Sequence, residues 1–566
     1  MNNPGSKILI GLAWPYANGS LHLGHASAFI CADVLARYHR LRGDDVLFVS
    51  GSDCFGTPIA VEALEKGIDP SEIANYYHDE FVKTLIDGLN FSYDNYTKTT
   101  SPTHQRVVQG LFLKLYERGY LYTKTESALF SPHLDRFLPD RFVEGTCPHC
   151  KLDGARGDQC DNCGKLLDPL DLINPRINKK ILKHDGLSAA DMALEQRESE
   201  HFYLKLSSLT QELENWIAEV SDSWRLNART FAVAFLRQGL KDRAITRDTN
   251  WGVPIPLPGY EEKRIYVWFE AVIGYFSASV EWAEKKGQPD AWQDWWHTDN
   301  AKHYYVHGKD NIPFHTIIWP GILKAEGSLH MPDQIVSSEF LNLEDKQFSK
   351  SRKWAVWLPE FLNAFDGELL RYFLITNGPE NNDTSFKWQE FQNKVNGELI
   401  GTYANFVNRV LSFTQKHFPQ GVSCQETLDG GAQDIIASVE KAFDDVGQYI
   451  EAGEFRKAYK RVLNILEDCN RHIDTIAPWK LIKDKSNVDE VAHYLALYVH
   501  IIENVSILFS PFTPHSSEHI MTMTQSTAPD KWEYRPLRPK YSATEVITLY
   551  RKIENEEIDG QKEKLG

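Results

Sequence analysis

The fold is decided by the stretch Pro15-Tyr16-Ala17-Asn18-Gly19-Ser20-Leu21-His22-Leu23-Gly24-His25. The apolar run before it, residues 7–14, predicts a buried strand, and the pattern of residues 26–40 predicts a helix that buries one face. The two histidines therefore lie where a strand gives way to a helix, a position where open α/β sheets bind ligands and helix N-termini favour phosphate. Gly24 would let a nucleotide approach the backbone closely. The alternative is two surface histidines in a loop.

Length and composition indicate a multi-domain globular chain. It has 566 residues, of which 42% are hydrophobic and 25% charged, and this length suggests about three to four domains. No apolar run approaches the roughly 20 residues of a membrane span, and the first residues do not resemble a signal peptide. We therefore expect a cytoplasmic protein without a membrane segment. The formal charge of −17 argues against non-specific polyanion binding, although a local basic face can still bind nucleic acid.

Four of the eight cysteines form two Cys-x-x-Cys pairs, namely Cys147, Cys150, Cys160 and Cys163. Two thiolate pairs this close in sequence can surround one zinc ion tetrahedrally. The alternative is a redox-active pair, but two neighbouring pairs favour a metal. A zinc ion held by four thiolates has no open position, so we expect a structural role, which is to hold together a segment too short to form its own core.

Strands and helices alternate in two separate parts of the chain. Further strands are predicted at 45–51, 264–268, 302–307 and 334–338, while residues from about 120 to 222 have the composition of an insertion. From about residue 391 onward, apolar residues recur at helical spacing. The sequence therefore predicts an α/β fold in which one parallel sheet is split by an insertion and is followed by a helical bundle.

Several polar groups are expected at one edge of this sheet. Asp53 follows the second strand and could bind an ammonium group, although a helix N-cap is the alternative. Trp268, Tyr275, Phe314 and His315 would gather nearby, as a pocket or as core. The basic loop Gln347–Lys353 could hold phosphate or be a solvated turn. Neither a Walker A motif nor G-x-G-x-x-G occurs in the chain, so any nucleotide site is built otherwise.

Together these motifs resemble those of the class I aminoacyl-tRNA synthetases. His22-Leu23-Gly24-His25 looks like their HIGH signature, and Phe348-Ser349-Lys350-Ser351 looks like the last four residues of their KMSKS signature. The split Rossmann domain, the zinc-bearing insertion and the helical bundle are similar to the methionine-specific branch. So are the segments 15–20, 266–268, 273–275 and 477–479, and the resemblance covers about residues 7 to 540.

The resemblance implies a ligase that activates L-methionine with ATP and Mg²⁺ and then transfers the methionyl group to the 3′ end of tRNA(Met). It implies catalytic roles for His22, His25 and Lys350, and ATP binding by His22, Gly24, His25, Ser349, Lys350 and Ser351. The implied methionine site contains Ala13, Tyr16, Asp53, Trp268, Ala271, Tyr275, Phe314 and His315. The implied anticodon site contains Asn405, Arg409 and Trp479.

The same resemblance divides the chain into six parts. These are two halves of a Rossmann-type catalytic domain (1–116 and 246–340), the connective insertion with one zinc knuckle (117–245), a KMSKS loop and stem-contact region (341–390), an anticodon-binding helical domain (391–550) and a charged tail (551–566). We expect the tail to fray. No further domain follows the bundle, so we expect a monomer.

The chain departs from the family pattern in places. Gln347 and Phe348 replace the first Lys-Met of KMSKS, which removes one cation that Lys346 could replace, and Val272 and Asn311 also differ. These departures leave open a related enzyme that uses a non-tRNA acceptor or acts as an inhibitor-insensitive duplicate. A zinc-ribbon RNA-binding protein without ATP turnover is the non-enzymatic alternative.

Overall fold

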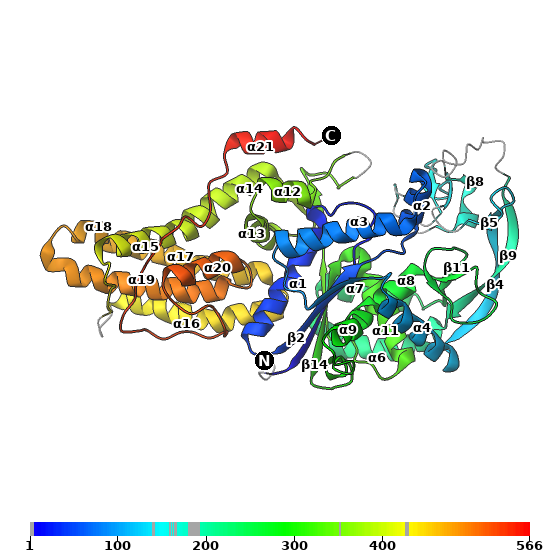
Figure 1. Ribbon diagram of the computed structural model, residues 1–566, viewed down its shortest axis with the longest axis horizontal. Coiled ribbons are helices and arrows are strands. Elements are labelled where there is room, and N and C mark those ends of the chain that lie inside the picture. Colours follow the sequence, from blue (N-terminus) through cyan, green and yellow to red (C-terminus); the bar gives the residue numbers. More distant parts are fainter. Residues whose placement is uncertain are drawn as a thin grey trace.

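The computed structural model describes residues 5–138, 142–157, 160, 162–163, 167–178, 193–349, 353–424 and 429–565. Its centre is a parallel five-stranded sheet of order β15-β14-β1-β2-β3. The strands are β1 (Lys7–Leu12), β2 (Asp45–Ser52), β3 (Asn95–Lys98), β14 (Ala301–Gly308) and β15 (Gln334–Ser338). The split sheet is therefore confirmed, because its two halves come from chain segments on either side of a long insertion (Figure 1).

Helices cover both faces of this sheet. Ile8, Ile10 and Leu12 of β1 pack in one hydrophobic cluster with α1 (Leu23–Leu41). The intervening Leu9 packs in a second cluster with residues of α4 (Pro102–Glu117) and α9 (Gly274–Lys285). Because side chains alternate along a strand, these clusters lie on opposite faces. The central strand is thus buried on both sides, as expected for a parallel sheet.

One predicted strand is wrong in part. Only Arg264–Ile265 pairs as a strand, β13, in a small antiparallel sheet with β11 (Thr246–Arg247) and β12 (Val253–Pro254). The chain then turns into α8 (Val267–Glu270), whose Phe269 N–H donates to the carbonyl of Tyr266 at 2.9 Å. Five apolar residues cannot by periodicity distinguish a strand from the start of a buried helix.

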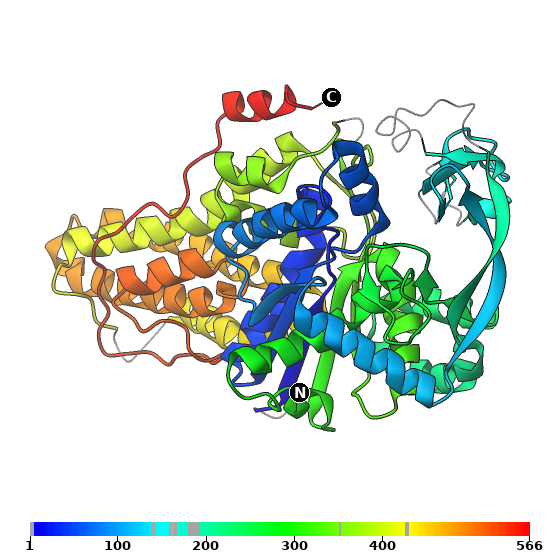
Figure 2. The ribbon, with the colours of Figure 1, turned by 45° about the vertical axis from the view of Figure 1, so that its right-hand side comes forward.

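The insertion leaves the sheet as a long two-stranded ribbon. β4 (Leu121–Ser131) and β9 (Glu195–Leu204) pair antiparallel along their whole length. The ribbon curves along one side of the molecule and carries a small sheet of β6 (Val143–Thr146), β7 (Ala155–Arg156) and β8 (Ile173–Ile177) near its far end (Figures 1 and 2). This small sheet packs on α2 (Thr57–Lys66) through Ala60 and Val61. The chain returns through α6 (Thr210–Val220) and α7 (Leu226–Arg237).

The C-terminal part is the predicted helical bundle. Its long helices are α15 (Asn405–His417), α16 (Gly430–Glu451), α17 (Phe455–Ile476) and α19 (Val488–Phe509), with α20 (Pro514–Met523) beside them (Figure 1). One described helical segment, Lys485–Phe509, is long and apolar enough to span a membrane, but 89% of its most apolar window is buried inside the protein. That burial is what a central bundle helix requires.

The expected fraying of the charged tail is wrong. After α20 the chain runs back along the bundle and forms α21 (Asn555–Lys562), which packs on α14 (Trp388–Lys394). Ile553 and Ile558 are buried, and Gln392 Nε2 donates to the carbonyl of Ile553 at 3.0 Å. These two buried isoleucines hold the tail against the bundle. The charged composition of the tail gave no sign of this packing.

A buried arginine joins the bundle to helix α1, which covers the central sheet. Arg371, on α13 (Gly367–Asn377), lies 2.7 Å from Asp33 of α1, and both side chains are fully buried. Its guanidinium also donates to the carbonyls of Phe512 at 2.8 Å, of Pro511 at 3.0 Å and of Leu89 at 3.1 Å. The Arg371 and Arg37 charges hold the pKa of Asp33 at about 2, against the opposing effect of burial.

Replacing Arg371 by alanine should destabilise the protein strongly, because Asp33 and three carbonyls would lose a buried donor. We expect a loss of about 3–5 kcal/mol in the free energy of unfolding, measured by urea denaturation. Arg471→Ala, which removes an exposed partner of Asp468, is the control and should cost less than about 1 kcal/mol. Equal effects of the two substitutions would contradict the importance of the buried contact.

Candidate active site

The carboxyl ends of β1 and β2 bring the first predicted site residues together. The backbone N–H of Asp53 donates to the carbonyl of Pro15 at 2.9 Å, and Ala17 N–H donates to the carbonyl of Asp53 at 2.8 Å. Ala13 N–H donates to the carbonyl of Val306, at the end of β14. These hydrogen bonds hold the loops that follow β1 and β2 next to each other and to the end of β14.

His22 and His25 form a capping box at the start of α1. The N–H of Gly24 donates to Nδ1 of His22, and the N–H of His22 donates to Nδ1 of His25, each at 3.1 Å. Because both Nδ1 atoms accept, each neutral ring carries its proton on Nε2. The half-buried rings, 4.0 Å apart between centroids, therefore supply two N–H donors beside a helix N-terminus, which suits an anionic oxygen.

The structure gives a second reason for glycine at position 24, beside the expected approach of a nucleotide. A Cβ at this position would lie 2.9 Å from both Cε1 and Nδ1 of the His22 ring. The space that the missing side chain leaves is therefore taken by His22 itself. Glycine is required here so that the histidine ring can fold back onto the helix cap.

The loop that resembles KMSKS lies against this cap. The Phe348 ring stacks on His22 with centroids 4.6 Å apart and planes at 8°. Ser349 and Trp354 exchange backbone hydrogen bonds of 2.9 and 3.0 Å, which closes the loop. The exposed Lys346 places Nζ 4.6 Å from the centroid of the Trp354 ring. Lys350 and Ser351 lie outside the described residues.

The predicted aromatic group is assembled from three segments. Trp268 of α8 donates from Nε1 to the hydroxyl of Tyr16 at 3.3 Å and packs edge-on against Phe314. Tyr275 of α9 lies 2.6 Å from Nε2 of His315 through its hydroxyl. Ala271 follows α8 directly, one turn before Tyr275, and is half-buried. These side chains lie above the same strand ends as Ala13 and Asp53.

The protonation state of His315 follows from its contacts. Nδ1 lies 2.8 Å from the carbonyl of Asn311, which can only accept, so Nδ1 carries the proton and Nε2 accepts from Tyr275. Burial lowers the pKa of His315 to about 4, which keeps the ring neutral. Sequence reasoning missed the part of Asn311, and no signal reveals it, because any residue type offers a backbone carbonyl.

The side chain of Asp53 is a buried carboxyl group. It is 4% exposed, and one oxygen accepts from the N–H of Phe55 at 3.2 Å. Burial and the nearby Glu270 raise its pKa well above the usual range for aspartate. A cationic group beside Asp53 would stabilise its ionised form. Glu270 and its partner His104 were also missed by the sequence analysis, since single buried polar residues leave no motif.

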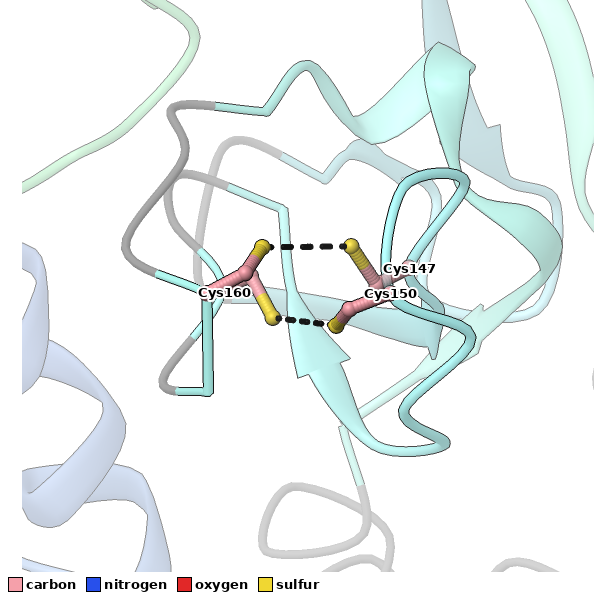
Figure 3. Close-up of side chains that lie close together, drawn as sticks. Cys147, Cys150 and Cys160 are labelled. Carbon is pink, nitrogen blue, oxygen red and sulfur yellow. Dashed lines mark hydrogen bonds between the residues drawn. The ribbon is translucent and has the colours of Figure 1, made fainter.

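The four cysteines of the insertion converge as predicted, and Figure 3 shows three of them, Cys147, Cys150 and Cys160, close together. Their Sγ atoms all lie within 4.8 Å of one another, with Cys147–Cys163 at 3.9 Å and Cys150–Cys160 at 3.5 Å. Tetrahedral zinc with Zn–S bonds of about 2.3 Å requires sulfur atoms about 3.8 Å apart, so the donor set fits. Hydrogen bonds from Leu152 N–H and Asn162 lower the pKa of Cys150 to about 6, which favours the thiolate that a metal needs.

The bundle brings the three predicted anticodon residues near one junction. Arg409 lies one helical turn after the exposed Asn405 on α15. The guanidinium of Arg409 lies 4.8 Å from the centroid of the Trp479 ring and forms a 2.9 Å ion pair with Asp474. Trp479 is half-buried rather than a core residue. An aromatic face and an arginine fork meet here at the protein surface.

Comparison with known proteins gives matches along the whole chain. Residues 8–411 match the family described as tRNA synthetases class I (M), and residues 421–566 match the anticodon binding domain of methionyl tRNA ligase. A methionine–tRNA ligase of Dehalococcoides mccartyi strain 195 is 45% identical over 99% of both chains. One from Streptococcus pneumoniae strain CGSP14 is 43% identical over 98% of both chains.

A solved structure has the same fold. It is methionyl-tRNA synthetase of Mycobacterium tuberculosis in complex with methionyl-adenylate, with a TM-score of 0.80 and 22% sequence identity. The match covers 96% of this chain and 99% of the other.

The buried neutral state of His315 predicts a specific pH dependence of stability. Its pKa of about 4 lies below the usual 6.5, so the unfolded state binds more protons between these values. The contribution is complete above about pH 6.5 and is lost as the pH falls toward 4. From pH 7 to 5, wild type should lose about 2 kcal/mol more unfolding free energy than His315→Gln. Urea denaturation at both pH values measures this, with the exposed His519→Gln as control.

Proposed function

The chain belongs to the methionine–tRNA ligases, the class I synthetases specific for methionine, and we propose that the residues gathered at its sheet edge carry out their reaction. These enzymes use ATP to join L-methionine to tRNA. The match of both family descriptions along the chain supports this activity and not the alternative acceptor. A purely RNA-binding role without catalysis is wrong.

The first step is attack by the methionine carboxylate on the α-phosphorus of ATP, which forms methionyl-adenylate and releases pyrophosphate. Asp53 would bind the ammonium group of methionine, since a buried carboxyl with a raised pKa gains most from a cation. The side chain would enter the pocket of Ala13, Tyr16, Trp268, Ala271, Tyr275, Phe314 and His315. A thioether packs well on aromatic edges and accepts only weak hydrogen bonds. It therefore suits a pocket of aromatic rings in which Tyr275 already donates its proton to His315 and the neutral His315 donates its own to the carbonyl of Asn311.

Stabilisation of the phosphate charge would come from the α1 cap. The backbone contacts of His22 and His25 use Nδ1, and we expect their Nε2–H groups to donate to the triphosphate as charge develops. Gly24 would approach through its backbone. Ser349, Lys350 and Ser351 would close over the phosphates, with Lys350 as a point cation. Mg²⁺ would arrive with the triphosphate and partly neutralise it.

In the second step the methionyl group passes from the adenylate to the 3′ end of tRNA(Met), and AMP is released. Asn405, Arg409 and Trp479 would read the anticodon, because a splayed base can stack on tryptophan, accept hydrogen bonds from arginine, and donate to or accept from asparagine. One zinc ion on Cys147, Cys150, Cys160 and Cys163 would hold the insertion in shape. The division into six parts given above, a cytoplasmic location and a monomeric state belong to the same proposal.

The direct test is methionine-dependent exchange of pyrophosphate into ATP, followed by aminoacylation of tRNA transcripts. We expect exchange with methionine and not with the other amino acids. Transcripts with the methionine anticodon should be charged, and transcripts with an altered anticodon should be charged poorly. Absence of methionine-dependent exchange in folded protein would refute the function, while charging that ignores the anticodon would refute the roles of Asn405, Arg409 and Trp479.

Phe348 should couple the loop to the first step, because its ring stacks on His22. An aromatic stack is worth about 0.5–1.5 kcal/mol, so Phe348→Ala should lower kcat of pyrophosphate exchange by about three- to tenfold. Phe348→Met, which keeps an apolar contact and resembles the family signature, should lose less. If both substitutions have the same effect, the stack does not position His22.

The purified protein should contain one zinc ion per chain, measured by elemental analysis. Cys150→Ser removes one thiolate of the four and should reduce the zinc content well below one, because a three-ligand site binds zinc more weakly. Cys424→Ser changes a half-buried cysteine outside the cluster and is the control. Zinc retained fully by Cys150→Ser would place the metal elsewhere.

A further inference from the structure

Behind the amino-acid pocket lies a chain of buried polar groups that the proposed chemistry does not use. Glu270, at the end of α8, and His104, on α4, are both fully buried, with Oε2 and Nε2 2.6 Å apart. His104 Nδ1 lies 2.7 Å from the hydroxyl oxygen of Ser277, and that hydroxyl donates to the carbonyl of Gly274 at 3.1 Å. The chain of contacts therefore runs from α8 through α4 to α9.

The order of these contacts determines where the protons are. Ser277 has one hydroxyl proton, and the Gly274 carbonyl can only accept it, so the serine oxygen accepts from Nδ1–H of His104. Burial lowers the pKa of His104 to about 3, so the ring is neutral and Nε2 has no proton of its own. The short contact between Nε2 and Oε2 then needs a proton from the Glu270 carboxyl. The pair as a whole is neutral.

The opposite arrangement is unfavourable for a physical reason. If Ser277 donated to His104, the ring would donate to an ionised Glu270, whose other oxygen, Oε1, is buried and has no hydrogen-bond partner among the described residues. A buried carboxylate with one unpartnered oxygen carries a large desolvation cost, and a neutral carboxyl carries much less. Burial accordingly raises the pKa of Glu270 well above the usual range.

The pair lies next to the proposed ammonium site. Glu270 stands two residues after Trp268 and directly before Ala271, and its charge, when present, raises the pKa of Asp53. The Trp14 ring packs between Gly51 and Gly274, 5.9 Å from the His104 ring. The other acidic group facing His104, Glu281 of α9, is paired with Lys285 at 3.1 Å.

We propose that Glu270 is a positioning residue that retains a proton through its contact with His104, so that Asp53 alone carries negative charge toward bound methionine. This rests on the proposed function. One negative charge matches the single ammonium group of the substrate. A second would repel the methionine carboxylate, which is attached to the same carbon as the ammonium group and must approach the negatively charged phosphates of ATP.

Infrared spectroscopy of the methionine-bound enzyme tests the protonation directly. Wild type should show the C=O stretch of a protonated carboxyl that is absent from Glu270→Gln and present in Glu281→Gln, the matched control on α9. Persistence of the whole protonated-carboxyl signal in Glu270→Gln would overturn the proposal. Methionine-dependent pyrophosphate exchange by wild type, measured alongside, separates this result from a failure of the proposed function.

Kinetics test the functional consequence. Glu270→Ala should raise the methionine KM at least tenfold while changing the ATP KM little, since the pocket loses its support. Glu270→Gln is neutral and can still donate to Nε2 of His104, so it should recover most of that loss, whereas Asp53→Asn should not bind methionine well. A methionine KM as high in Glu270→Gln as in Glu270→Ala would show that an ionised Glu270 is needed. Thermal unfolding identifies variants that fail to fold.

Discussion

The pairing of β1 with β14 is the contact on which the site depends. β1 lies in the middle of the sheet, and its register against β14, from Lys7 opposite Ala301 to Leu12 opposite Val306, brings together the two halves of the chain. Where the pairing ends, the chain turns into the cap with His22 and His25 on one side and the segment with His315 on the other. Gly11 lets Tyr275 of α9 pack directly on β1, because a Cβ there would lie 2.8 Å from the Tyr275 ring. Without that pairing the phosphate-facing and methionine-facing residues would not meet.

The parts of the fold that sequence reasoning predicted are those with long apolar patterns. β1, β2 and β14 are buried strands of six to eight residues, and the bundle helices repeat apolar residues over several turns. β15, with the sequence QIVSS, was predicted from a shorter pattern. The wrong predictions concern segments whose apolar pattern is short or is hidden among charged residues. Residues 264–268 are too few to separate a strand from a helix start, and α21 depends on two isoleucines in a charged tail. Local pattern was insufficient wherever packing against a distant element decides the structure.

Some features of the candidate site could likewise be predicted from the sequence, and others could not. Side chains in motifs, such as His22, Asp53 and the four cysteines, could be named because their residue type carries the chemistry. Their proton positions could not, because these depend on backbone groups: Gly24 N–H for His22, and the Asn311 carbonyl for His315. The neutral pair of Glu270 and His104 joins residues far apart in sequence through contacts that no spacing reveals. The second reason for glycine at position 24 was likewise visible only once the His22 ring was placed.

The buried contact of Arg371 with Asp33 has a consequence for how a large ligand is recognised. Rocking of the bundle against the sheet would separate the Arg371 guanidinium either from the Asp33 carboxylate and the Leu89 carbonyl or from the carbonyls of Pro511 and Phe512. Either loss in a buried interior is costly. The two bodies therefore move as one, and the protein itself sets the span from α15 to the sheet edge. An RNA that binds both at α15 and at the sheet edge must therefore match a fixed distance between these two sites.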